Sequence, residues 1–318
     1  MKKGIKWIVL AVAVIVVVFI TISFLAWEQS KESKKTDVVK MFAEHEDEYT
    51  KLLKKAEQGD AEAQFNLGEM LDCGEYKFYY PNDYIRQLKA IEWLTKAAEQ
   101  GQAYAQNSLA WMYRDGKGVP QDNKEAVKWY RKAAEQGEAE AQCCLGDMYL
   151  HGWGVPKEYK EAAKWYRKAA EQEDAYAQAK LGFMYEDSIF DMPQDYKEAV
   201  KWYRKSAEQG NAYAQNGLGD MYNDGKGVSQ DYQEAVKWYR KSAEQGYGGA
   251  QSGLGRMYEE GKGVPEDYVQ GYKWYILAEA QGRREYEEYR DLLKQRMTPE
   301  QIAEAQKLAR EFKPVTSQ

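Results

Sequence analysis

Apolar and small residues recur along this chain at helical spacing. The same pattern returns 36 residues later, because Leu109 and Leu145 hold the same place in successive copies. In the copy at 211–246, a first helical stripe has apolar or small residues at i, i+4, i+7 and i+8: Ala214, Leu218, Met221 and Tyr222. A second stripe follows the glycines at 225 and 227: Ala235, Trp238, Tyr239 and Ala243. Each copy therefore predicts a helical hairpin, and hairpins must stack because one alone cannot bury both stripes.

Two kinds of residue recur from copy to copy and indicate the core. Small residues on the first helix let helices approach closely: Gly68, Ala110, Gly146, Gly182, Gly219 and Gly255. Tryptophans recur on the second helix: Trp93, Trp129, Trp165, Trp202, Trp238 and Trp274. We expect these indoles to be buried between successive hairpins and to have no cofactor role.

One copy shows the complete motif. Residues 139–170 read AEAQCCLGDMYLHGWGVPKEYKEAAKWYRKAA, and most of these positions recur in six copies. The motif resembles the Sel1-like repeat family, a relative of the tetratricopeptide repeats, over about residues 60 to 282. The resemblance implies an all-α fold, a right-handed α-solenoid of stacked helical hairpins. It also implies a scaffold that binds other proteins, often in bacterial envelopes or signalling systems.

The repeats set the predicted domain boundaries. Residues 1–27 are expected to form a cytoplasmic tip and a transmembrane signal anchor, 28–36 a linker, and 37–59 a capping half-repeat. Six repeats are expected to follow: 60–101, 102–137, 138–173, 174–210, 211–246 and 247–282. Residues 283–318 are expected to form C-terminal capping helices, the last of which begins with a capping box of Thr298 and Gln301.

The N-terminal segment predicts a membrane span. Three lysines precede an uncharged apolar run over residues 7–27, and about twenty such residues cross a bilayer. A cleaved signal peptide is the alternative, although its apolar region is usually about 7–15 residues long. We expect a single-pass membrane protein with a cytoplasmic N-terminus and with repeats outside the cytoplasm, in the periplasm.

Charge and reactive residues narrow the function classes. Acidic residues outnumber basic ones by 51 to 45, and a net charge of −6 argues against a nucleic acid partner. His45 and His151 are the only histidines, and neither belongs to a catalytic motif, so no enzyme activity is expected. The three cysteines have no repeating spacing, which predicts no disulfide framework. We also expect no cofactor and no metal site.

The candidate binding face lies on the first helix of each hairpin. The third, sixth and tenth positions of each repeat vary between copies while their neighbours stay fixed. These three positions lie on one face of the helix, because they are spaced i, i+3 and i+7. The residues proposed for this concave face are Tyr104, Asn107, Trp111, Glu140, Asp147, Tyr176, Phe183, Tyr213, Asn216 and Asp220. Acidic and aromatic positions alternate, which suits a protein or peptide with basic and apolar side chains. Alternatively, the rings pack against the neighbouring helix, and for Phe183 both interpretations stay open.

Two function classes follow from these features. The first is a membrane-anchored scaffold for protein–protein interaction that binds its partner in the concave groove, in cell-envelope assembly or signalling. The second is a cell-envelope polysaccharide-binding protein or hydrolase that uses the same groove, because aromatic faces also stack on sugars. The missing catalytic residues favour the scaffold.

Overall fold

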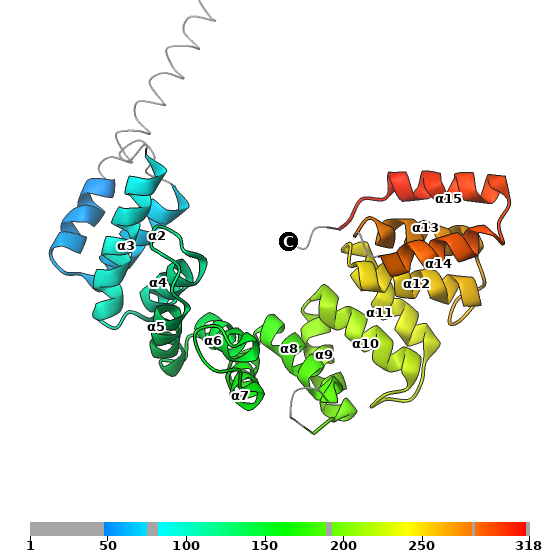
Figure 1. Cartoon of the computed structure of the whole chain (residues 1–318), viewed down its shortest axis with the longest axis horizontal. Coiled ribbons are helices and arrows are strands. Elements are labelled where there is room, and N and C mark those ends of the chain that lie inside the picture. Colours follow the sequence, from blue (N-terminus) through cyan, green and yellow to red (C-terminus); the bar gives the residue numbers. More distant parts are fainter. Residues whose placement is uncertain (1–47, 75–81, 189–192, 282–283, 316–318) are drawn as a thin grey trace, which may run out of the picture. The chain divides into compact units, whose positions relative to one another are not determined.

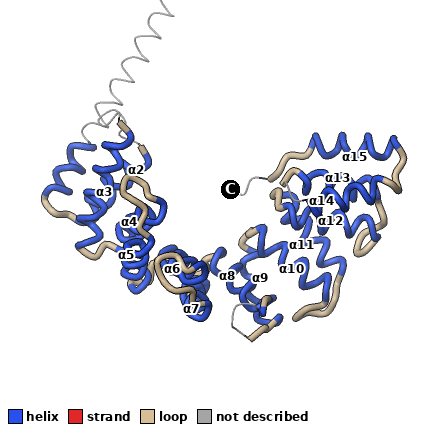
Figure 2. The backbone as a smooth tube through the Cα atoms, viewed as in Figure 1, coloured by secondary structure: helices blue, strands red, loops and turns tan. Residues whose placement is uncertain are grey.

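The computed structural model describes residues 48–74, 82–188, 193–281 and 284–315. All regular secondary structure in these ranges is helical, so the predicted all-α class is confirmed (Figures 1 and 2). The chain divides into two compact units, Met1–Gln100 and Gly101–Gln318, and each is described by itself. All the predicted site residues belong to the second unit.

The first unit contains one hairpin and the helix that precedes it. A helix over 48–57 is followed by α2 (Ala61–Cys73) and α3 (Asp83–Glu99). Leu67, Leu71 and Leu94 are fully buried where α2 packs on α3. Residues 75–81, between α2 and α3, lie outside the described residues.

The second unit is a stack of five hairpins closed by two further helices (Figure 1). In each hairpin we call the first helix A and the second helix B. The pairs are α4 (Ala103–Asp115) and α5 (Asn123–Glu135), α6 (Ala139–His151) and α7 (Tyr159–Glu171), α8 (Ala175–Glu186) and α9 (Tyr196–Glu208), α10 (Ala212–Asp224) and α11 (Tyr232–Glu244), and α12 (Gly248–Glu260) and α13 (Tyr268–Glu279). From α6 onward, each helix A packs on its own helix B and on helix B of the preceding hairpin. This is the packing of a solenoid.

The Gly-Lys-Gly turn between helices A and B has a structural role. Gly225 ends α10 with a left-handed φ of 70° and a backbone N–H that donates to the Met221 carbonyl. A Cβ on Gly227 would lie 2.2 Å from the carbonyl oxygen of Tyr196, at the start of the preceding helix B. The second glycine is therefore required by close contact between hairpins.

A tyrosine of helix B closes each hairpin, because it packs on the small residue of helix A. In the hairpin of α8 and α9, a Cβ added to Gly182 would lie 2.5 Å from the Tyr203 ring, and one added to Gly217 of the next helix A would lie 2.9 Å from it. The equivalent tyrosines are fully or almost fully buried: Tyr130, Tyr166, Tyr203, Tyr239 and Tyr275. These tyrosines are buried more deeply than the tryptophans that precede them.

In four of the five hairpins, the hydroxyl of this tyrosine donates a hydrogen bond to a carboxylate at one of two positions on helix A. Tyr166 donates to Asp147 over 2.5 Å and Tyr239 donates to Asp220 over 2.6 Å. Where that position is not acidic, the acid lies three residues later: Tyr203 donates to Glu186 over 2.7 Å and Tyr275 donates to Glu259 over 2.8 Å. Repeat two has Trp111 and Arg114 at the two positions, and the buried Tyr130 hydroxyl has no oxygen or nitrogen acceptor among the described residues.

Buried glutamines link successive hairpins. Gln178 on α8 donates to the carbonyl oxygen of Ala170 over 3.1 Å, and its own carbonyl oxygen accepts from Gln209 over 2.9 Å. The same pair of bonds recurs at Gln142 and Gln215. The bond to the carbonyl oxygen crosses to the preceding repeat, whereas the bond between the two glutamines lies within one hairpin, so each buried glutamine fixes the register of its hairpin on the one before it.

The recurrent tryptophans occupy the interfaces between hairpins to different degrees. Trp165, Trp202 and Trp274 are 5–6% exposed, as expected, whereas Trp129 and Trp238 are only partly buried. A lysine three residues later lies over most of these rings; Lys241 Nζ, for example, lies 4.2 Å from the Trp238 ring centroid. Most of these tryptophans therefore pack against a neighbouring hairpin and are covered by a lysine ammonium group.

The C-terminal end of the stack is closed by α14 (Arg284–Lys294) and α15 (Pro299–Glu311), which pack on α13. The capping box of Thr298 and Gln301 is present. Beyond α15, the Phe312 ring packs edge-on against Trp274 with centroids 5.5 Å apart. The end of the chain thus covers the last repeat.

The predicted single-pass membrane localisation is contradicted, and with it the cytoplasmic N-terminus and the periplasmic repeats. In the part of the chain that the structure describes, no helix is both long and apolar enough to cross a membrane. The longest described helix, α3, has 17 residues and bears charged side chains. The predicted span at 7–27, the linker at 28–36 and residues 37–47 of the half-repeat lie outside the described residues.

We predict that Tyr239→Phe destabilises the protein by about 1.5–3 kcal/mol, because it removes a hydrogen bond to a carboxylate. The matched change Tyr130→Phe removes a buried hydroxyl without an oxygen or nitrogen acceptor, so it should be neutral or stabilising. Urea unfolding of both variants measures the difference. Equal destabilisation by the two changes would show that the tyrosine–acid hydrogen bond contributes nothing.

Candidate functional site

The predicted site residues connect the A helices of successive hairpins. Asn107 on α4 donates to Glu140 on α6 over 3.1 Å, and the Tyr176 hydroxyl on α8 donates to Asp147 on α6 over 3.1 Å. Between α8 and α10, the rings of Phe183 and Tyr213 meet edge-on with centroids 6.2 Å apart. The predicted residues therefore follow one face from α4 to α10. For Phe183 the structure shows the packing against a neighbouring helix A that the sequence left open.

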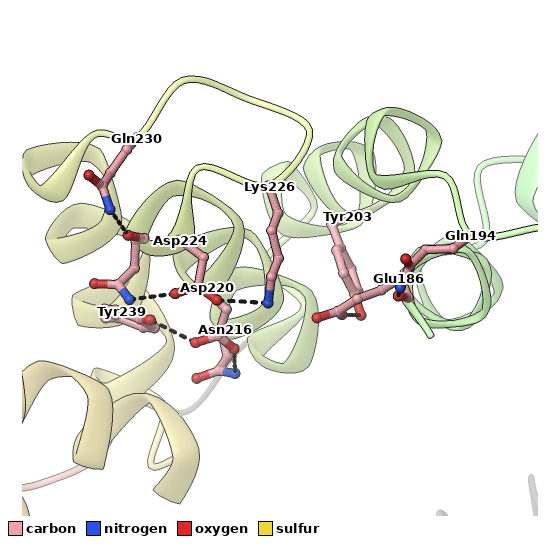
Figure 3. A network of polar contacts seen from close by, with 10 residues as sticks. Glu186, Gln194, Tyr203, Asn216, Asp220, Asp224, Lys226, Gln230 and Tyr239 are labelled. Carbon is pink, nitrogen blue, oxygen red and sulfur yellow. Dashed lines mark hydrogen bonds and ion pairs between the residues drawn. The ribbon is translucent and has the colours of Figure 1, made fainter. Parts of the chain in front are cut away.

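Four of the predicted residues line one cavity of about 330 Å³. It lies between α8, α9 and α10 and is lined by Phe183, Glu186, Asp187, Tyr196, Tyr203, Tyr213, Asn216, Gly217, Asp220 and Lys226. Aromatic rings and carboxylates thus converge in a cavity of the size that small ligand groups occupy. Figure 3 shows a network of polar contacts that includes Glu186, Tyr203, Asn216, Asp220 and Lys226 of this lining.

The aromatic wall of the cavity is fixed by ring contacts. Tyr213 is flanked by Phe183, Tyr203 and Tyr247, each with ring centroids 6.2 Å from its own. Burial raises the pKa of Tyr203 and of Tyr213, so both hydroxyls stay protonated near neutral pH. A protonated Tyr203 can therefore donate permanently to Glu186.

Two carboxylates of the cavity are held by buried tyrosines. Asp220 accepts from Tyr239 at one oxygen and from Asn216, over 2.9 Å, at the other (Figure 3). Burial raises the pKa of Asp220 from 3.8 to about 6, although the Tyr239 hydrogen bond opposes the shift. Burial also raises the pKa of Glu186, whose carboxylate, within the described part of the chain, accepts from Tyr203 at Oε2 alone. Glu186 therefore keeps one oxygen for another donor.

Lys226 is the cation of the cavity lining. Its Nζ donates to Asp224 over 2.9 Å and lies 5.9 Å from the Tyr196 ring centroid. The hydrogen bond to Asp224 raises the pKa of Lys226, so its ammonium stays charged. In Figure 3, Lys226 lies between Asp224 and the pair of Tyr203 and Glu186.

The other predicted residues lie outside this cavity. Tyr104 is 61% exposed and Tyr176 is 43% exposed. Trp111 is partly buried beneath Lys117, whose Nζ lies 4.6 Å from its ring centroid. Asp147 is partly buried and accepts from Tyr166 and Tyr176. Among them, Tyr176 is an exposed ring beside an acid that is already hydrogen-bonded.

Sequence reasoning missed several cavity residues, among them Glu186, Tyr196, Tyr203 and Lys226. Glu186 could have been found, because it lies three residues after Phe183, one helical turn along the same face. Tyr196 and Lys226 come from the start of a helix B and from a turn, and only the packing of hairpins brings them to the face. A pattern confined to helix A gives no indication of them.

The first unit has a second cavity, of about 460 Å³, that contains none of the predicted residues. Its charged groups largely pair with each other, since Glu92 accepts from Lys89 over 2.8 Å and from Lys96 over 2.9 Å. Lys96 also covers Trp93 at 4.1 Å from the ring centroid. This cavity therefore offers a weaker site for a charged ligand.

Comparison with known proteins shows which repeat family the hairpins resemble. The model of the Sel1 repeat matches residues 61–102, 103–138, 139–174, 175–211, 212–247 and 249–282. These six segments cover more than half of the sequence.

This chain belongs to the Sel1 repeat family.

A solved structure agrees with that assignment. A Sel1 repeat protein from Oxalobacter formigenes is 36% identical to this Sel1 repeat protein, over 70% of this chain and 86% of the other, with a TM-score of 0.60. A protective antigen present in uropathogenic Escherichia coli strains, which displays an SLR fold, is 28% identical over 83% of this chain and 71% of the other, with a TM-score of 0.37. None of the curated proteins compared with the chain is similar to it. Sel1 repeat proteins generally mediate protein–protein interaction, which fits a face built from successive A helices.

We predict that Asp220 makes stability depend on pH. The folded state holds the Asp220 proton more tightly than the unfolded state, with a pKa of about 6 against 3.8, so its contribution is most favourable below about pH 4 and is lost as the pH rises to 6. Asp220→Asn should remove this dependence and still accept from Tyr239. The measurement is the difference in urea midpoint between Asp220→Asn and wild type from pH 3 to 8. A difference that stays constant over this range would contradict the buried carboxyl.

Proposed function

We propose that this protein binds a protein partner along the face of its A helices, with the cavity between α8, α9 and α10 as an anchor. The observation that carries the proposal is the cavity itself, where four of the predicted residues meet. Members of the Sel1 repeat family generally bind proteins, and the family supports the class of partner. The repeat array supports an extended segment, because equivalent positions recur along it.

The exposed aromatic residues supply contact area beside the cavity. Tyr104 and Tyr176 are large and substantially exposed, and tyrosine and tryptophan are the side chains that most often dominate binding energy. Tyr176 is held in place by its hydrogen bond to Asp147 and by Lys180, whose Nζ lies 4.9 Å from its ring centroid. A partner would therefore meet side chains that are already oriented, which lowers the entropy cost of binding.

A scaffold accounts for the carboxylates better than a hydrolase does. The acids of the cavity, Glu186 and Asp220, accept from buried tyrosines in the same way as Asp147 and Glu259 do elsewhere in the array. Their first role is thus to satisfy a buried hydroxyl, and the acids of repeats three to six share it. We propose a binding function without a catalytic step.

We predict that the double change Tyr104→Ala and Trp111→Ala abolishes partner capture while helicity is kept, because both residues lie on the proposed face. Truncation at a binding hot spot costs about 2 kcal/mol or more. The measurement is crosslinking pull-down from the native cell with the full chain as bait, followed by mass spectrometry, with circular dichroism as a folding check.

A matched control uses one tryptophan and one tyrosine away from the face. Trp153, in a turn, is 45% exposed and Tyr289, on α14, is 46% exposed. The double change Trp153→Ala and Tyr289→Ala should leave capture intact. The proposal fails if the Tyr104 and Trp111 variant captures the same proteins as wild type, or if the control variant loses them equally.

A further inference from the structure

Repeats four and six have the acid that accepts from the buried tyrosine at the later of the two positions on helix A, and in repeat six the chain supplies its own arginine. In repeat six, Tyr275 donates to Glu259 Oε2, and Arg296 Nη1 donates to Glu259 Oε1 over 2.9 Å. The guanidinium of Arg296 also lies over the Tyr268 ring, with its Cζ 4.5 Å from the ring centroid. Arg296 is in the connection between α14 and α15, beyond the last repeat.

The same positions in repeat four form the cavity between α8, α9 and α10. Glu186 corresponds to Glu259, since each lies five residues after the leucine that recurs on every helix A, here Leu181 or Leu254. Tyr203 corresponds to Tyr275 and donates to Glu186 Oε2. Tyr196 corresponds to Tyr268, because each is the first residue of its helix B. Repeat four therefore has the acid, the donor tyrosine and the ring, arranged around open space.

Repeat four has no counterpart of Arg296. Glu186 Oε1 accepts no hydrogen bond, and Glu186 forms no ion pair, with any residue in the described ranges. The nearby cation, Lys226, is paired with Asp224 over 2.9 Å and stays 5.9 Å from the Tyr196 ring centroid. The carboxylates Glu186, Asp187 and Asp220 outnumber the single ammonium group in the lining. Among the described residues, the cavity therefore lacks a counterpart of the arginine that occupies the equivalent site in repeat six.

We propose that the cavity between α8, α9 and α10 receives an arginine side chain of the protein partner, in the way that Glu259 and Tyr268 receive Arg296. The assignment rests on the proposed partner-binding function and names the side chain that this site recognises. The guanidinium would donate to Glu186 Oε1 and lie over the Tyr196 ring. A planar guanidinium suits both contacts at once, because it has several N–H donors and a face that stacks on aromatic rings.

The test measures binding of blocked tetrapeptides to the full chain by NMR titration. The peptides differ in one side chain only: arginine, citrulline or lysine. Citrulline has nearly the shape of arginine without its charge, and lysine has the charge without the planar group. We expect the arginine peptide to bind at least tenfold more tightly than the citrulline peptide, about fivefold more tightly than the lysine peptide, and more weakly as salt is added. Equal affinity of the arginine and citrulline peptides, or of the arginine and lysine peptides, overturns the assignment.

Variants locate the binding event. Glu186→Gln keeps an acceptor for Tyr203 but removes the charge, and we expect it to lower the affinity for the arginine peptide at least tenfold. Glu259→Gln makes the same change in repeat six, where Arg296 already fills the site, and should alter affinity less than twofold. Equal weakening by both changes would mean that the peptide senses only overall negative charge and would overturn the proposal.

Two further changes keep the test decisive if Glu186→Gln fails to fold. Tyr196→Leu removes the ring and should weaken the arginine peptide about fivefold or more. Lys226→Met removes the competing cation and should strengthen binding about threefold. Unchanged affinity in both variants overturns the site.

Failure of this proposal can be told apart from failure of the proposed function. If no arginine peptide binds while partner capture still depends on Tyr104 and Trp111, the arginine assignment fails and the binding face stands. If capture is also insensitive to those two residues, both proposals fail.

Discussion

A buried tyrosine of helix B packs against a small residue of helix A, and the rest of the array depends on this contact. A Cβ on Gly182 would lie 2.5 Å from the Tyr203 ring, so the two helices can approach only if that residue has little or no side chain. Burial also excludes water from the hydroxyl, which then requires an acceptor within the protein. An acid on helix A meets this requirement at Asp147, Glu186, Asp220 and Glu259. Hairpin packing therefore places carboxylates on the same face as the predicted site.

The requirement for an acceptor explains how repeats differ while the fold is kept. The acid alternates between two positions one helical turn apart, and the position that it leaves becomes free to vary. In repeat four that position holds Phe183, which forms part of the aromatic wall beside Tyr213. In repeat two neither position is acidic, and Tyr130 is left without an oxygen or nitrogen acceptor in the described part of the chain. The positions that satisfy the buried hydroxyl and the positions of the proposed binding face are thus the same few positions of helix A.

Much of the fold could be predicted from the sequence, because the repeats act as internal comparisons. The period, the helical stripes and the capping box at Thr298 all follow from local spacing, and the structure contains the helices that they indicate. Periodicity says which face of a helix points inward but not how deep each residue lies. It therefore predicted that Trp238 and Tyr239 both face the core, although Tyr239 is fully buried and Trp238 is only partly buried.

The candidate site was only partly predictable, for a similar reason. Spacing on one helix placed Phe183 together with residues of the same face, and Tyr213, Asn216 and Asp220 do line the same cavity. Tyr196 and Lys226 reach that cavity through contacts between hairpins, which no pattern within helix A contains. The prediction of a single-pass membrane protein was based on the apolar run at 7–27, which lies outside the described residues, and among the described helices none is long and apolar enough to support it.

The most direct test of a partner-binding face is site-specific photo-crosslinking in the native cell. A photoreactive amino acid replaces Asn216, which lines the cavity, or Lys128, which points away from the core on helix B of repeat two with its side chain 67% exposed. A partner on the face of the A helices predicts a discrete protein adduct from position 216 and none from position 128. Adducts from position 128, with none from position 216, would contradict this account.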